Sequence, residues 1–112
     1  MGTRAMQETT FLILTALAGG SRHGYAIITD VDEISGGRVH LRAGTLYTAL
    51  DRLEVEGLIE IDREEIVDNR LRRYYRLSGA GSTRLAEEAQ RLRSHATAAI
   101  SRLKLTRGPA TA

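Results

Sequence analysis

The stretch from Arg42 to Leu58 constrains the fold of this chain most strongly. Its leucines recur with helical spacing, so that one stripe is apolar and the opposite side is free for another contact: Leu46, Leu50 and Leu53. Gly57 stands where a helix ends in the left-handed conformation, and Leu58 follows as the residue that reaches back toward Leu53. The pattern predicts one amphipathic helix that ends at Gly57, with a strand directly after it.

The polar side of this predicted helix carries side chains suited to a DNA major groove. They are Arg42, Thr45, Tyr47, Thr48 and Arg52. Two other interpretations stay open. Any amphipathic surface helix carries polar residues on its wet side, and Tyr47 can instead pack beside Leu46 and Leu50. The helix start is weakly specified, because Arg42 or Ala43 would be the N-cap and neither offers a short side-chain oxygen.

After Gly57 the hydrophobic period changes from helical to two, which predicts a β-hairpin. Leu58 to Arg63 is the first strand, Glu64 to Asn69 contains the turn, and Arg72 to Leu77 is the return strand. We expect Tyr75 and Leu77 to face the core, because that register places the charges of Arg72 and Arg76 on the other side, together with Tyr74.

The segment from Arg70 to Arg76 places four arginines within seven residues and contains no acidic residue, the densest such block in the chain. A basic hairpin tip after a polar helix predicts phosphate contacts from Arg70, Arg72 and Arg73. The alternative is that these arginines are solvated, or pair with Glu60 and Asp62 across the hairpin.

The remaining segments predict three further helices, at Gln7–Ala18, Arg22–Ile34 and Ala80–Leu105, and a short strand at Val39–Leu41. Ser21 and Ser78 are the candidate N-caps of the second and last of these helices. The expected inner stripe of the second helix is Tyr25, Ile28 and Val31, with either Ile27 or Ile34.

Two helices carry more apolar surface than one small core requires. The first presents Phe11 and Leu14 among apolar residues that cover more than one face. The last has apolar residues at alternating steps of four and three, as in a heptad seam: Leu85, Ala89, Leu92, Ala96, Ala99 and Leu103. Because a 112-residue chain buries a limited fraction of its surface, we predict a homodimer through the first and last helices.

Composition excludes several functional classes. The chain has no cysteine, and His23, His40 and His95 lack the spacing of a metal site. Ser78–Gly81 fails the glycine-rich fingerprint for dinucleotides, because Arg84 stands at the third glycine position and no βαβ unit surrounds it. We therefore expect no catalytic residues, no metal and no cofactor. The apolar runs are too short for a membrane span, so we expect a soluble, cytoplasmic protein.

The order of these elements predicts a mainly α, α+β fold: a winged helix-turn-helix with a two-stranded wing and a long C-terminal dimerisation helix. The corresponding divisions are a DNA-binding domain at 1–78, the dimerisation helix at 79–106 and a disordered tail at 107–112. Fifteen arginines against one lysine favour bidentate contacts with DNA, although arginine richness is also a compositional habit of some genomes.

Several motifs in this order give the chain a family resemblance. They are H-G-Y at His23 to Tyr25, G-T-L-Y at Gly44 to Tyr47, L-x-x-L-x-x-x-G-L-I at Leu50 to Ile59, and R-R-Y-Y-R-L-S-x-x-G at Arg72 to Gly81. The chain resembles the PadR-like transcriptional regulators, in their short form with one C-terminal helix. It departs from them at Arg42-Ala43, where relatives often have Ser-Pro, and it lacks the tryptophan that short relatives use to bind flat drugs.

This resemblance implies a homodimeric repressor that binds a pseudo-palindromic operator in double-stranded DNA and, in some members, releases it when a small molecule enters the dimer interface. It also implies groove or phosphate contacts from Thr45 and Tyr47, a phosphate contact from Tyr25, and wing contacts from Arg70, Arg72 and Arg73. The rival hypothesis is a dimeric module with the same fold that binds a protein or an effector without operator specificity.

Overall fold

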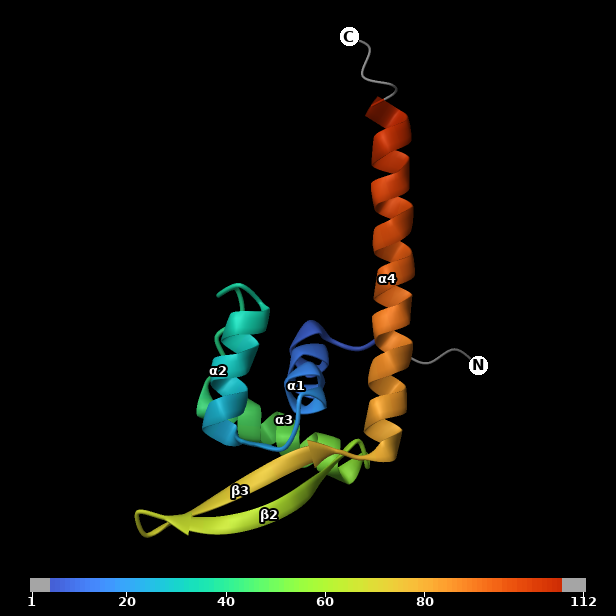
Figure 1. The fold of residues 1–112 in the computed structure, drawn as a ribbon. Helices are drawn as coiled ribbons and strands as arrows, with labels where there is room; N and C mark the ends of the chain where they lie inside the picture. The colour runs from blue at the N-terminus through green and yellow to red at the C-terminus, as the bar shows by residue number, and fades with distance from the viewer. Residues whose placement is uncertain (1–4, 108–112) are drawn as a thin grey trace.

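The computed structural model describes residues 5–107, with side chains through Lys104. The described elements are, in chain order, α1 (Glu8–Ala18), β1 (Arg22–His23), α2 (Gly24–Ile34), α3 (Ala43–Val55), β2 (Ile59–Val67), β3 (Arg70–Leu77) and α4 (Gly79–Arg107). They form a winged helix-turn-helix of the α+β class with a long C-terminal helix, as predicted (Figure 1). The disordered tail expected at 107–112 falls, apart from Arg107, outside the described residues, and Arg107 itself is the last residue of α4.

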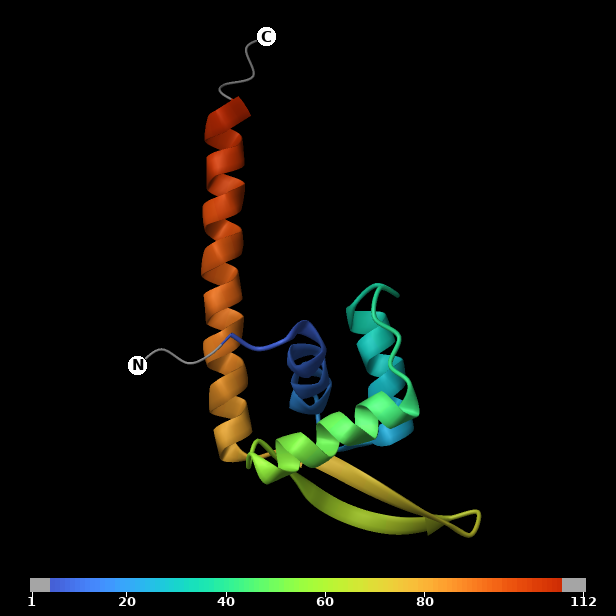
Figure 2. The same ribbon diagram turned by 180° about the vertical axis from the view of Figure 1, so that it is seen from behind.

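Helix α1 lies between α2 and α4 in both views of the molecule (Figures 1 and 2). It is buried on several sides, because it packs against α2, β3 and α4. The largest fully buried side chains come from α1, α2, α3 and the start of β2: Ile13, Leu14, Ile27, Val31, Leu46, Leu50, Leu53 and Ile59. The leucine stripe predicted for α3 therefore faces the core.

The hairpin has the predicted register, with Tyr75 buried and Leu77 packed against the core. Its strands pair from Ile59 opposite Leu77 to Val67 opposite Arg70 and are longer than predicted. They are longer because Asp68 and Asn69 alone make the turn, with φ angles of 52° and 62°. Two consecutive left-handed residues match the twist of the flanking strands.

The sheet has a third strand that the sequence did not predict. In β1, Arg22 pairs with Tyr75 and His23 pairs with Tyr74, so the described sheet has the order β1-β3-β2. Because these two residues are extended, α2 begins at Gly24 and its N-cap is His23 rather than Ser21. Ser21 instead donates a hydrogen bond to Asp62 at 2.7 Å.

Two further predictions around α2 were wrong. Residues 39–41 are not a strand, since the Val39 amide donates to the Ser35 hydroxyl at 3.0 Å and the segment pairs with no strand in the described sheet. Tyr25 is not part of the inner stripe and is 76% exposed. Ile27 is buried, and a residue two positions earlier on a helix falls on the opposite side. Ile34, at the end of α2, is also exposed.

The corner between α3 and β2 anchors α4. Gly57 ends α3 with a φ of 78°, as predicted, and the Leu58 amide donates to the Leu53 carbonyl at 3.0 Å, a hydrogen bond typical of a glycine cap. The Ser78 hydroxyl accepts from the Gly81 amide at 2.9 Å and donates to the Gly57 carbonyl at 2.6 Å. Ser78 therefore caps α4, as predicted, and also ties the start of that helix to the end of α3.

Helix α4 projects away from the rest of the molecule (Figures 1 and 2). Its 29 residues span about 43 Å at the usual rise per residue. The radius of gyration is 17.6 Å, whereas a compact chain of this length has about 13 Å. Within residues 5–107, no helix has both the length and the apolar character needed to cross a bilayer.

Candidate nucleic-acid interface

A cleft of about 500 Å³ lies between the tip of the hairpin and the beginnings of α2 and α3. We call it the wing cleft. It brings together five of the predicted DNA-binding residues, and its lining is His23, Gly24, Tyr25, Tyr47, Val67, Asp68, Arg70, Leu71, Arg72 and Arg73. Residues from three separate parts of the sequence therefore form one surface.

The arginines of the wing differ in whether an acidic side chain neutralises them. Arg73 lies opposite Glu64 and donates to it at 2.6 Å, a hydrogen bond that raises the pKa of Arg73. Arg76 pairs with both Glu60 at 3.2 Å and Asp62 at 2.7 Å.

Arg70 and Arg72 have no acidic side chain within 4.0 Å among the described residues. The cross-strand neighbour of Arg70 is Val67, and Glu65 opposite Arg72 pairs instead with Arg63 at 3.5 Å. The pairing predicted as an alternative for the whole block thus applies to Arg76, and a similar pair neutralises Arg73. Arg70 and Arg72 retain the unneutralised charge at the wing cleft.

His23 joins the wing to the start of α2, a role that its sequence position alone did not reveal. Its Nδ1 accepts a hydrogen bond from the Ala26 amide at 3.3 Å, and its ring meets Tyr74 edge-on at 5.3 Å between centroids. The guanidinium of Arg63 lies over the same tyrosine ring at 3.9 Å. Burial lowers the pKa of His23, and the charge of Arg72 lowers it further. A neutral imidazole is what this cap requires, because Nδ1 must accept.

The exposed side of α3 is polar in its N-terminal half and acidic further along. Arg42 is the exposed N-cap and makes no side-chain capping bond. Thr45 and Thr48 are exposed and line a groove of about 600 Å³ between α1 and α3, whereas Asp51 and Glu54 are exposed in the C-terminal half. The positive end of the helix dipole also lies at the N-terminus. An anionic ligand is therefore favoured only along the first half of α3.

Tyr47 lies on the flank of α3 that faces the wing cleft and is 46% exposed. Tyr25 reaches the same cleft from the first turn of α2. Their position beside Arg70 and Arg72 combines hydroxyl donors with unneutralised cations, which is the chemistry of phosphate contacts.

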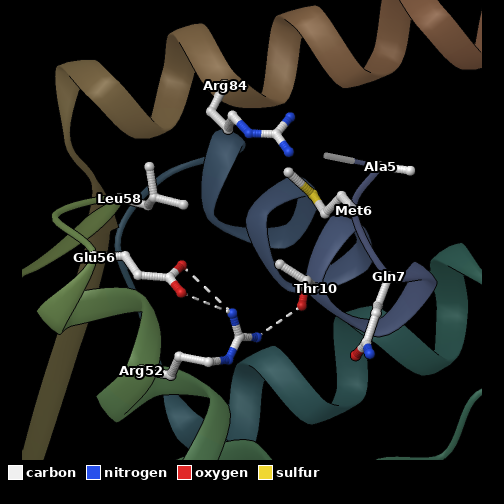
Figure 3. A pocket seen from close by; sticks show the side chains of 8 residues that line it. All are labelled: Ala5, Met6, Gln7, Thr10, Arg52, Glu56, Leu58 and Arg84. Atoms are coloured by element: carbon white, nitrogen blue, oxygen red, sulfur yellow. Dashed lines mark hydrogen bonds and ion pairs between the residues drawn. The ribbon is translucent and has the colours of Figure 1, made fainter. Parts of the chain in front are cut away.

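Arg52 lies outside the wing cleft and lines the groove between α1 and α3 together with Thr45 and Thr48. Its guanidinium donates to the Thr10 hydroxyl at 2.9 Å and to the Glu56 carboxylate at 3.4 Å (Figure 3). These groups line a pocket of about 430 Å³ between the start of α1, the end of α3 and α4. In this structure Arg52 joins α3 to α1.

Glu88 on α4 is a charged residue that the sequence patterns did not single out. It is 2% exposed, accepts from the Met6 amide at 3.3 Å, and pairs with Arg91 and, at 3.7 Å, with Arg84. The hydrogen bond from Arg91 lowers the pKa of Glu88 from 4.5 to about 2. This carboxylate attaches the segment before α1 to the base of α4.

The predicted dimerisation residues divide into buried and uncovered groups. Leu14 is fully buried in the core of the single chain, so its side chain is not available to a partner. Phe11 and Leu85 are partly buried against that core. The rest of the seam is exposed, with Leu92 at 39% and Leu103 at 57%, along with Ala89, Ala96 and Ala99.

Residues 13–87 match the profile of the transcriptional regulator PadR-like family. The chain belongs to this family. Membership confirms the resemblance seen in the sequence motifs, and it agrees with the expectation that the chain is not an enzyme, since PadR-like proteins are transcriptional regulators. The short subfamily is not decided by this match.

Among PadR-like relatives, transcriptional regulator Rv3488 of Mycobacterium tuberculosis is 38% identical over 72 residues, which are 64% of this chain and 53% of that protein. The region matched by this chain covers 53% of Rv3488 and 22% of a second relative, an uncharacterized protein from Streptomyces fradiae. The chain therefore spans about half the length of these relatives or less.

Two solved PadR structures are similar to this one. A PadR family regulator from Clostridium difficile has a TM-score of 0.72 at 28% identity and covers 88% of this chain and 100% of its own. Bacillus subtilis PadR, solved in complex with operator DNA, has a TM-score of 0.64 at 26% identity and covers 72% of this chain and 46% of its own.

Proposed function

We propose that this PadR-like protein is a dimeric, sequence-specific DNA-binding regulator that represses transcription from a pseudo-palindromic operator. The observation that carries the proposal is the wing cleft, where the unneutralised Arg70 and Arg72 lie beside two exposed tyrosines and the polar half of α3. Bacillus subtilis PadR, which has a similar fold, was solved with operator DNA, and this supports the same role here.

The contacts divide between affinity and specificity. Arg42, Thr45 and Thr48 lie on the half of α3 that enters a major groove when a helix-turn-helix binds DNA. Tyr47, on the flank of this helix that faces the wing cleft, contacts phosphates together with Tyr25, Arg70 and Arg72. Arg73 contributes less charge, because Glu64 already pairs with it. Arg52 supports the recognition helix through Thr10 rather than touching DNA.

A second copy of the chain completes the regulator. The exposed seam of α4, together with Phe11 of α1, is the surface that a partner would cover. A two-fold axis along this seam would place two recognition helices about one DNA turn apart. Repression and release by a small-molecule effector follow from the resemblance to PadR-like repressors. We also propose that the protein acts in the cytoplasm.

A gel-shift titration with the promoter region of the protein's own gene, over a series of salt concentrations, tests the DNA role. The double variant Arg70→Ala, Arg72→Ala should weaken binding to promoter and random DNA alike. It should also reduce the slope of log affinity against log salt by about 0.9 for each lost phosphate contact, or about 3.6 for two arginines in each of two subunits.

The matched control is Arg93→Ala, which removes an exposed arginine on α4 that also has no acidic partner within 4.0 Å among the described residues. It should leave the slope at the wild-type value. A double wing variant with the wild-type slope would contradict the phosphate contacts. Wild-type protein that binds its promoter no better than random DNA would instead favour the rival role, a dimeric module that binds an effector or a protein.

A further inference from the structure

Gly24, the first residue of α2, lies against the phenol ring of Tyr47 from α3. The glycine is buried, and a methyl group built on it would overlap the Tyr47 hydroxyl oxygen and lie 2.8 Å from Cζ. Side-chain carbons do not approach other atoms within 3.0 Å without a shift of one of them. The ring of Tyr47 can occupy this place only because residue 24 has no side chain.

The backbone of α2 gives no separate reason for a glycine at this position. Gly24 is not among the glycines with a positive φ, so an L-residue can adopt its conformation. Inside a helix, alanine is more favourable than glycine, because glycine loses more conformational entropy. Glycine is therefore unfavourable for the helix at position 24, and the reason for its presence is the space that the Tyr47 ring occupies.

The other side of the ring faces the wing. Tyr47 lines a small cavity of about 260 Å³ with Leu71, Arg73 and Tyr75. Arg73 is itself fixed by its ion pair with Glu64 at 2.6 Å. The ring thus lies between α2 and the inner face of the hairpin. Tyr47 is nevertheless 46% exposed, and it lines the wing cleft.

We propose that Gly24 is a positioning residue for DNA binding: its missing side chain holds the Tyr47 phenol at the mouth of the wing cleft, where the hydroxyl meets the DNA backbone beside Tyr25 and Arg72. The inference rests on the proposed DNA-binding function. A side chain at position 24 displaces the Tyr47 ring and moves its hydroxyl away from the DNA backbone. Gly24 itself touches no DNA.

The first test measures the ring without DNA. The protein is labelled with 3-fluorotyrosine, and its Tyr47 fluorine resonance is assigned by its loss in Tyr47→Phe. Gly24→Ala should shift this resonance. Gly79→Ala is the matched control, because Gly79 is likewise the first residue of a helix and a methyl group there meets nothing within 4 Å. An unchanged Tyr47 resonance in Gly24→Ala would overturn the proposal.

The second test is a double-mutant cycle on promoter binding. In the protein that has Tyr47, Gly24→Ala should weaken binding by about tenfold for each subunit, the size of one lost hydrogen bond to a charged group, and therefore by about a hundredfold for the dimer. In the Tyr47→Ala background it should change affinity by less than about twofold, because additivity fails only for coupled sites. Thermal melts of all four proteins accompany the cycle, and the double variant, which has no clash, reports on folding of α2 if Gly24→Ala alone is unstable.

Equal losses of affinity in both backgrounds would overturn the positioning role and assign Gly24 to α2 itself. The failure of the proposed function has a different signature. In that case wild-type protein shows no promoter binding, while Gly24→Ala still shifts the Tyr47 resonance. This result would show that Gly24 positions the ring but would refute its role in DNA binding.

Discussion

Glu88 is a residue whose pKa is strongly lowered by the fold. Arg91, the Met6 amide and Arg84 surround its carboxylate, which is removed from solvent. A carboxyl group whose pKa falls on folding stabilises the folded state above its unfolded pKa. That contribution is lost as the pH falls toward the folded pKa.

We predict that unfolding free energy declines between about pH 4.5 and about pH 2 in part because Glu88 takes up a proton. Glu88→Gln should lower stability at neutral pH and flatten the decline across this window. Urea titrations at several pH values measure both effects. Glu87→Gln, which alters the exposed neighbouring carboxylate, is the control. A Glu88→Gln protein with the wild-type pH profile would show that the carboxylate is not held by these partners.

At the same scale, the wing shows how a neighbour decides what an arginine does. Arg72 and Arg73 are adjacent in sequence, yet they lie on opposite faces of β3 and meet different residues of β2. One is neutralised by Glu64 and the other retains its charge at the wing cleft. Adjacent residues of the same type therefore make unequal contributions to the proposed DNA surface.

Among the elements, α4 is joined at its N-terminus to the end of α3. Ser78 serves both sides of this junction, because its hydroxyl accepts from the Gly81 amide and donates to the Gly57 carbonyl. The helix N-terminus and the glycine cap of α3 are thus satisfied by one side chain.

Ser78→Ala should destabilise the protein by about 1–2 kcal/mol, since it removes an N-cap and leaves the Gly57 carbonyl without its donor. Chemical denaturation monitored by circular dichroism measures the change. Ser78→Thr should retain most of the stability, because threonine also caps. Ser82→Ala, at an exposed position one turn later, should stay close to wild type. Equal effects of Ser78→Ala and Ser82→Ala would remove Ser78 from this role.

In the whole molecule, the packing of a single chain does not explain why α4 projects away from the core. From Leu92 to Lys104 every described side chain is exposed, including Ile100 and Leu103. A long helix with an apolar seam and no covering element is marginal in water by itself. A second copy that buries this seam would remove the difficulty.

We predict that Leu92→Asp dissociates the dimer, because it places a charge in the apolar seam without a partner. Sedimentation velocity should show the wild type as a dimer and the variant as a monomer. Ser94→Asp adds the same charge on the opposite side of α4, since the two positions lie two residues apart, and should leave the dimer intact. A Leu92→Asp protein that sediments as a dimer would place the interface elsewhere.

Features that depend on near neighbours along the chain were predictable from the residue pattern. Helical spacing of the leucines predicted the buried side of α3, the glycine pattern predicted its end, and Ser78 was recognisable as a cap. Period-two alternation together with the segregation of charge predicted that Tyr75 faces inward. In each case a repeat or a cap leaves its signal within a few residues, so no knowledge of distant contacts is needed.

Contacts between residues far apart in the sequence could not be predicted and became known from the fold. Two-residue β1 has no periodicity of its own and exists only because β3 offers it a partner. The same holds for Arg52, which turns toward Thr10, and for Leu14, whose burial requires α1 to be covered on several sides. The contact between Tyr47 and Gly24 joins two helices through residues that lie more than twenty positions apart in the sequence. Such contacts arise from packing in three dimensions, which local patterns of hydrophobicity and charge do not encode.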